Sequence, residues 1–174
     1  QRFNPLVMDV VRSYDGKTYA VPFYQVAQAL YYRKDHFVEA GLDPNKPPRT
    51  WDEFYEYGQR LTENAPRRPG FVFSNPVTGK AYWWTNFLWQ AGGEVLKPAA
   101  NGYMQSAIDS PEGAVALDFF RKLTTKKWTK DGKTYGPVAL VSQNHSQDIS
   151  AGKVSMWFAY TNDVLLSVSD TGIG

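Results

Sequence analysis

Cysteine is absent from this chain of 174 residues, and only two histidines are present. Without cysteine there is no disulfide, no thiolate nucleophile and no cysteine-bound zinc or iron–sulfur centre. His36 and His145 do not form an HExxH pair, so we expect both to be partly exposed side chains without a catalytic role. The sequence therefore predicts neither a metal site nor a cofactor.

Long apolar runs and charge of one sign are also missing. No stretch approaches the roughly 20 apolar residues that cross a bilayer, and the chain begins at Gln1 without a basic-then-apolar leader. The 19 basic and 17 acidic residues are spread along the chain, which leaves a net charge of +2. A protein that follows a phosphate backbone needs a basic stripe. We therefore expect no nucleic-acid partner.

Common catalytic motifs are lacking as well, because the sequence contains no GxSxG, GxxxxGK[ST] or GxGxxG pattern. Most acidic residues stand in turns or in the first turns of expected helices, which leaves Glu94 and Asp163 without an evident structural role. A glycoside-active enzyme would need two such carboxylates facing each other across a pocket. That enzyme class stays the alternative, and we expect no catalytic residue.

Aromatic residues are abundant, with 6 Trp, 11 Tyr and 10 Phe. They are densest in AYWWTNFLW at positions 81–89. On a helix, Trp83, Trp84 and Phe87 share one side, whereas Tyr82 and Trp89 lie toward another. Tryptophan is rarely buried whole, because its N–H needs an acceptor. We therefore expect at least one of the two consecutive indoles to reach the boundary of the core.

Hydrophobic periodicity and turn residues predict an α/β layered domain. The clearest local signal is a capping box, in which the Thr50 hydroxyl accepts from the amide of Glu53 and the Glu53 carboxylate returns to the amide of Thr50. The expected elements are helices within 4–14, 35–44, 50–64, 81–93, 110–127, 146–152 and 161–169, strands at 71–73 and 153–160, an extended or two-stranded segment around Pro22, and turns at 100–103 and 131–132.

Aromatic side chains adjoin amides or acids at three places, each next to an expected strand end or helix start. The apolar C–H face of a sugar stacks on an aromatic ring, and its hydroxyls need donors and acceptors. The pattern therefore predicts a carbohydrate site, and the alternative is that every ring belongs to the core. The three places are Tyr24 with Gln25, Trp83 to Asn86, and Tyr160 with Asn162 and Asp163.

Five segments, in this order along the chain, resemble family 1 extracellular solute-binding proteins of ABC importers, whose fold resembles that of maltose-binding protein. They are DGKTYAVPF, ALYYRKDHFVEAGLDPNKPPRTWDEFYEYGQRLT, FLWQAGGEVL, DSPEGAVALDFFRKL and AGKVSMW. The resemblance implies a type II periplasmic-binding-protein-like lobe with layers α/β/α, from a protein of two lobes that closes by a hinge. Residues 1–22 would be a remnant of the first lobe, 23–27 a hinge crossing, and 28–174 most of the second lobe.

The same resemblance implies a substrate-binding subunit that captures a sugar or oligosaccharide between the lobes and delivers it to a membrane permease. We expect such a protein to be a monomer outside the cytoplasm, in the periplasm or anchored by lipid at the cell surface. Relatives that bind a polyamine or a peptide are a further alternative. Asn162 departs from the tryptophan that the family often has there. By position, the ligand-binding residues would be Tyr24, Gln25, Tyr82, Trp83, Trp84, Tyr160, Asn162 and Asp163.

Overall fold

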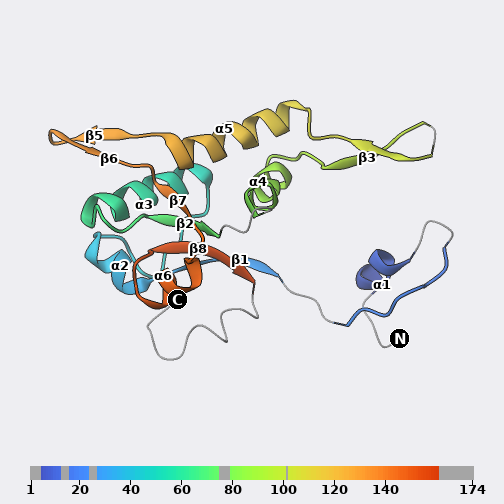
Figure 1. Cartoon of the computed structure of the whole chain (residues 1–174), viewed down its shortest axis with the longest axis horizontal. Helices are drawn as coiled ribbons and strands as arrows, with labels where there is room; N and C mark the ends of the chain where they lie inside the picture. The colour runs from blue at the N-terminus through green and yellow to red at the C-terminus, as the bar shows by residue number, and fades with distance from the viewer. Residues whose placement is uncertain (1–4, 13–15, 24–26, 75–78, 101, 161–174) are drawn as a thin grey trace.

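A computed structural model describes residues 5–12, 16–23, 27–74, 79–100 and 102–160 (Figure 1). Its helices are α1 (Pro5–Val11), α2 (Lys34–Glu39), α3 (Trp51–Asn64), α4 (Gly79–Gln90), α5 (Pro111–Thr125) and α6 (His145–Ser150). Its strands are β1 (Gln28–Tyr32), β2 (Phe71–Ser74), β3 (Leu96–Pro98), β4 (Met104–Ser106), β5 (Trp128–Lys130), β6 (Lys133–Tyr135), β7 (Ala139–Ser142) and β8 (Met156–Tyr160).

The central sheet has the strand order β1-β8-β2-β7. Strand β2 runs parallel to β7 and to β8, whereas β1 runs antiparallel to β8. The carboxyl ends of β2 and β8 therefore lie at one end of the sheet, together with the beginning of β1, where Gln28 pairs with Tyr160. This end of the sheet carries the candidate site.

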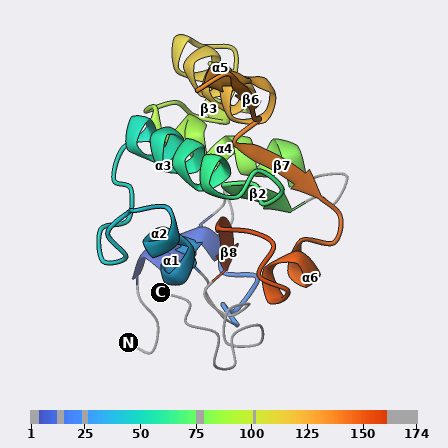
Figure 2. The ribbon, with the colours of Figure 1, turned by 90° about the vertical axis from the view of Figure 1, so that its left-hand side faces the viewer.

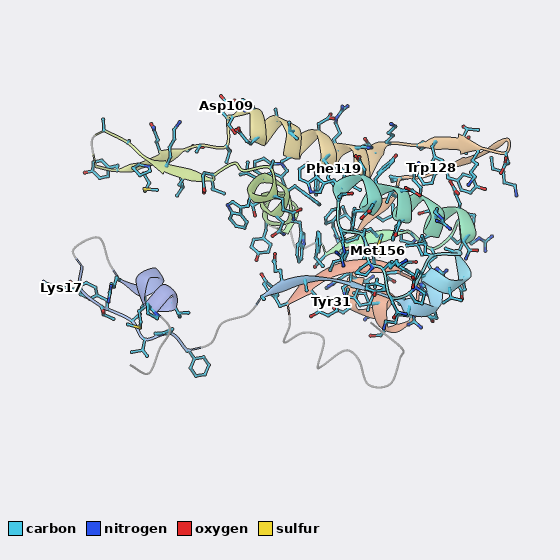
Figure 3. The ribbon with its side chains drawn as sticks, turned by 180° about the vertical axis from the view of Figure 1, so that it is seen from behind. Lys17, Tyr31, Asp109, Phe119, Trp128 and Met156 are labelled. Carbon is cyan, nitrogen blue, oxygen red and sulfur yellow. The ribbon has the colours of Figure 1, made fainter. Side chains whose placement is uncertain are left out.

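Residues of β2 and β8 alternate between two apolar clusters, as the period of a strand requires. Met156 and Phe158 face the larger cluster with α3, α4 and α5, and Trp157 faces a smaller cluster that contains Ile149 of α6. Figures 1 and 2 show α3, α4 and α5 on one side of the sheet and α6 on the other. Phe119 of α5, labelled with Met156 in Figure 3, belongs to the larger cluster. The predicted α/β layering is confirmed.

Helix starts follow their caps. The Thr50 hydroxyl accepts from the Glu53 amide at 3.2 Å, and the Ser110 hydroxyl accepts from the Gly113 amide at 3.1 Å. The expected return bond differs, since Glu53 Oε2 accepts from the amide of Arg49 at 2.7 Å. The Glu53 carboxylate therefore binds the amide of Arg49, one residue before the amide of Thr50 that the capping box predicted. This half of the predicted box is wrong.

Two hairpins and an N-terminal segment extend from the layered body. Hairpins β3–β4 and β5–β6 project beyond opposite ends of α5 (Figure 1). The predicted turn between β5 and β6 is present, with positive φ at Asp131 and Gly132. Helix α1 and the chain near Lys17 lie apart from the sheet (Figures 1 and 3). Helix α1 ends at Val11, and the expected closing helix from Thr161 falls outside the described residues.

His36 is buried, which corrects the expectation of a partly exposed side chain. It is 4% exposed, and its Nδ1 lies 3.2 Å from the hydroxyl of Ser155. Burial, assisted by the positive charge of Arg68, lowers the pKa of His36 to about 4. The sequence expectation failed because this histidine stands in the first turn of α2, on the side that faces the start of β8. The ring is therefore a neutral part of the packing at physiological pH.

Candidate functional site

Three polar side chains from distant parts of the chain meet at the carboxyl end of β8. Tyr82 lies near the start of α4, Tyr160 ends β8, and Gln28 begins β1. The Tyr82 hydroxyl oxygen accepts from Gln28 Nε2 at 2.6 Å and from the Tyr160 hydroxyl at 2.7 Å. We call Gln28, Tyr82 and Tyr160 the tyrosine cluster. It combines two aromatic rings with an amide and two hydroxyls.

Tyr82 offers a hydrogen-bond donor at the surface. Its ring is 41% exposed, and its oxygen already accepts two hydrogen bonds. Among the residues that the structure describes, no acceptor takes the hydroxyl hydrogen of Tyr82. Burial of the hydroxyl and the bond from Tyr160 raise the pKa of Tyr82 to about 12, so the group stays protonated at neutral pH. It can therefore donate to an oxygen atom of a ligand.

Trp83 holds α4 against the sheet. Its indole is 6% exposed, stacks on Phe158 with ring centroids 5.8 Å apart, and donates from Nε1 to the Ser74 carbonyl at 3.2 Å. Trp84 is half-buried, and its Nε1 is buried without an acceptor in the described part of the chain. Trp83 thus packs in the core beneath Tyr82, which it meets edge to face at 5.5 Å.

The sequence-predicted site residues fall into three groups. Tyr82 and Tyr160 are brought together although 78 positions separate them. Trp83 is buried in the larger apolar cluster, and Trp84 packs against that cluster. The remaining four lie outside the described residues: Tyr24, Gln25, Asn162 and Asp163. Ligand binding stays a prediction for all eight.

Sequence reasoning missed Gln28. The only feature of the sequence that points to Gln28 is its place a few positions after Gln25, in a stretch that is predicted to be extended. The β1–β8 register sets Gln28 opposite Tyr160, and its side chain reaches Tyr82 on α4. Glu94 is exposed after α4, and Asp163 lies outside the described residues, so the facing pair that an enzyme would need stays untested.

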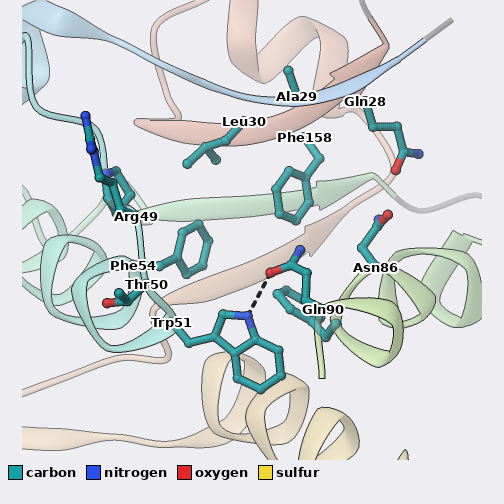
Figure 4. Close-up of a pocket in the computed structure, with 12 residues that line it drawn as sticks. Gln28, Ala29, Leu30, Arg49, Thr50, Trp51, Phe54, Asn86, Gln90 and Phe158 are labelled. Carbon is teal, nitrogen blue, oxygen red and sulfur yellow. Dashed lines mark hydrogen bonds between the residues drawn. The ribbon is translucent and has the colours of Figure 1, made fainter. Parts of the chain in front are cut away.

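A groove of about 280 Å³ adjoins the tyrosine cluster through Gln28, under β1 and between α3 and α4 (Figure 4). Its floor includes Phe54 and Phe158, and Asn86 stands on its α4 side near Gln28 (Figure 4). Trp51 Nε1 donates to Gln90 Oε1 at 2.8 Å at the other end. The groove is thus lined by aromatic rings and by amides.

The described residues show neither a cation cage nor a membrane span. No group of three or more His, Asp or Glu side chains converges in them to hold a metal ion. Their helices are all too short or too polar to cross a bilayer.

Known proteins resemble this chain along almost its whole length. The sequence model of the family described as "Bacterial extracellular solute-binding protein" matches residues 2–171. The mannitol-binding protein of Pseudomonas aeruginosa is 29% identical over 156 residues, which cover 83% of this chain and 31% of that protein. The sn-glycerol-3-phosphate-binding periplasmic protein UgpB of Brucella abortus is 40% identical over 58 residues, 33% of this chain and 13% of the relative.

Solved structures share the fold. The cyclic alpha-maltosyl-1,6-maltose binding protein of Arthrobacter globiformis matches with a TM-score of 0.75 at 25% identity, over 98% of this chain and 41% of that one. UgpB of Mycobacterium tuberculosis, solved with glycerophosphocholine, matches with a TM-score of 0.77 at 20% identity, over 99% and 41%. The chain thus spans less than half the length of these proteins.

The layered sheet, the order of its elements and these matches agree with a type II periplasmic-binding-protein-like lobe, as the sequence predicted. The family and its structural neighbours are binding proteins. Since the family model covers nearly the entire sequence, this chain belongs to the bacterial extracellular solute-binding proteins.

Proposed function

We propose that this chain is part of the substrate-binding subunit of an ABC importer, which captures a sugar or oligosaccharide and delivers it to a membrane permease. The family membership supports the class, and the names of relatives that bind mannitol and a cyclic maltosaccharide support a polyhydroxylated ligand. The observation that carries the ligand chemistry is the tyrosine cluster. It presents the hydroxyl donor of Tyr82 and the rings of Tyr82 and Tyr160 at the carboxyl end of β8. α/β folds bind ligands at the carboxyl ends of their parallel strands.

The cluster is organised before a ligand arrives. Gln28 and Tyr160 both donate to the Tyr82 oxygen, which fixes the phenol and directs its hydrogen away from them. Tyr82 then donates to a ligand hydroxyl, and the rings of Tyr82 and Tyr160 receive an apolar C–H face. Because the geometry is fixed beforehand, little side-chain entropy is lost on binding. Affinity of this kind breaks no covalent bond, so we propose capture without catalysis.

The lobe assignment is part of the same proposal. Residues 1–22 would belong to a first lobe, 23–27 would form the hinge crossing, and 28–174 would form most of a second lobe. Val21 is 70% exposed and Phe23 is 95% exposed in a segment that stands apart from the sheet (Figure 1). Exposed apolar side chains that lie this near one another are typical of a surface that another part of a protein covers. This supports a ligand site between two lobes.

Four further ligand contacts follow from position in the chain. Tyr24 and Gln25 precede Gln28 by a few residues, and Asn162 with Asp163 follow Tyr160 directly. Both pairs are thus only a few residues along the chain from members of the tyrosine cluster. A carboxylate such as Asp163 accepts from two vicinal hydroxyls of one sugar. We propose that the protein acts as a monomer outside the cytoplasm, in keeping with its family.

The direct test is calorimetric titration of the intact two-lobed protein with monosaccharides, oligosaccharides and alditols, and with putrescine and a tripeptide as non-sugar controls. We expect saturable binding of at least one polyhydroxylated ligand, with a change in tryptophan fluorescence as the lobes close. Binding of putrescine or the tripeptide alone would contradict the sugar assignment. Turnover of chromogenic glycosides that is lost in Glu94→Gln would contradict capture without catalysis.

A further inference from the structure

A second hollow lies at the opposite end of the sheet. Its volume is about 590 Å³, and its lining comes from the segments that precede β2 and β8. These are the amino ends of the parallel strands, whereas the tyrosine cluster lies at the carboxyl end of β8. We call it the basic hollow and define it by its lining residues, Ala65, Pro66, Arg67, Arg68, Gly152 and Lys153.

Every charged group in this lining is a cation. Arg68 is the only one of the three with an acidic partner among the described residues, through Nη2 to Glu39 at 2.7 Å. Arg67 and Lys153 are exposed, and the described part of the chain brings no carboxylate within 4.0 Å of either. The lining therefore keeps a surplus of positive charge. The lowered pKa of the neighbouring His36 has burial as its main cause, and the charge of Arg68 is the next.

In the described part of the chain, the side chains of Arg67 and Lys153 do not bond the carbonyl groups at the ends of the neighbouring helices. The hollow lies beyond the carboxyl ends of α3 and α6, where basic side chains often bond the last carbonyl groups. The hydrogen bonds of the described residues include no such bond from the side chain of Arg67 or Lys153. At these ends the backbone makes its own closures, from Ala65 to Leu61 and from Gly152 to Ile149. Both side chains are therefore available to a ligand.

We propose that the basic hollow binds a phosphate group. A phosphate carries up to two negative charges and three strong acceptor oxygens. These match Arg68, whose charge is partly compensated by its acidic partner, together with Arg67 and Lys153, for which the described residues supply no acidic partner. The planar guanidinium of Arg67 suits two oxygens of one phosphate, and the ammonium of Lys153 adds a point charge. Gly152, which has no side chain, leaves room in the lining for the guanidinium of Arg33, which lies close to it. Free phosphate presents this chemistry in full, and the phosphodiester of an anionic phospholipid headgroup presents one negative charge and two free oxygens.

The first experiment separates a site from general screening. The melting temperature of the intact protein is followed against inorganic phosphate while sodium chloride holds the ionic strength constant. We expect a saturable rise that the double variant Arg67→Gln/Lys153→Gln loses, with each single variant weakening the apparent affinity about tenfold. The matched control Arg121→Gln/Lys97→Gln removes the same two charges at exposed positions away from the basic hollow and the groove, and it should keep the response. Equal responses in the two double variants, or no response to phosphate in the unchanged protein, would overturn the proposal.

The second experiment identifies the source of the phosphate group. Phosphatidylglycerol vesicles and phosphatidylcholine vesicles are sedimented with the same proteins. Retention on phosphatidylglycerol alone, competed by phosphate and lost in the Arg67→Gln/Lys153→Gln variant, would assign a lipid headgroup. A phosphate-dependent shift without vesicle retention would assign free phosphate. Vesicle binding that the double variant retains would contradict a role for the basic hollow. Sugar titrations of the same variant should be unchanged, which separates this proposal from the ligand site.

Discussion

Replacing Tyr82 by phenylalanine removes one oxygen and leaves the ring. In the free protein, Gln28 Nε2 and the Tyr160 hydroxyl lose their shared acceptor, with present distances of 2.6 and 2.7 Å. Tyr82 is 41% exposed, so water replaces most of what is lost, and unfolding should become easier by only about 1 kcal/mol. The ligand loses a donor that Gln28 and Tyr160 had oriented, so affinity should fall about tenfold, or about 1.4 kcal/mol.

The assay is calorimetry of the intact protein with its best sugar, together with urea unfolding of each variant. Tyr57→Phe is the matched control, because Tyr57 lies on α3 and meets Phe37 edge to face at 5.8 Å, away from the tyrosine cluster. It should keep the affinity. If Tyr82→Phe bound as tightly as the unchanged protein, the cluster would not contact the ligand. If it unfolded several kcal/mol more easily, the hydroxyl would be structural and the argument from exposure would fail.

Three further changes test the packing that positions the site. Lowering the pH from 7 to about 4 should reduce the free energy of unfolding by about 3 kcal/mol through His36. The pKa of His36 is about 4 in the folded protein and 6.5 when the side chain is free, so the unfolded chain is protonated first as the pH falls. Urea unfolding at several pH values measures this loss. Gly70→Ala should cost about 3 kcal/mol, because a Cβ there would clash with the backbone oxygen of Gly58. Thermal unfolding measures this loss. Thr50→Ala should cost about 1 kcal/mol by loss of the α3 cap, measured in the same way.

Each of these has its own control. The contribution of His36 is present above pH 6.5 and is lost as the pH falls toward 4, so His36→Gln should flatten the profile in that window; an unchanged slope would contradict the burial argument. Gly102→Ala meets no atom within 4 Å and should cost only about 1 kcal/mol of backbone strain at its positive φ. Thr50→Ser should restore most of the cap, and a Thr50→Ala protein as stable as the original would contradict it.

Local chemistry in the sequence predicted most of the fold. The Thr50 and Ser110 hydroxyls cap α3 and α5 because each needs only an amide three positions away. The continuous apolar run MWFAY is typical of a strand whose two faces are both covered, and β8 contributes to an apolar cluster on each face. Strand β7 (Ala139–Ser142) was not predicted, because four residues after Gly136 and Pro137 carry too little periodicity. Its place beside β2 is decided by packing over a long sequence separation.

The site was predictable in part, for physical reasons that differ between residues. Tyr82 and Tyr160 stood out as aromatic residues at element ends, and the fold joins them. Gln28 belongs with them only through strand register, which no short-range pattern reports. The sequence left open which of Trp83 and Trp84 reaches the boundary of the core; Trp83 is buried because its acceptor, the Ser74 carbonyl, lies inside the fold. His36 was misjudged for the same reason, because Ser155 comes from a distant segment.

The most direct test of the central claim is a crystal structure of the intact protein with a bound sugar. The proposal predicts a ligand oxygen about 3 Å from the Tyr82 hydroxyl, with the Gln28 and Tyr160 bonds to that hydroxyl retained and a sugar C–H face on one of the two rings. A sugar bound elsewhere, with the tyrosine cluster still open to water, would contradict it.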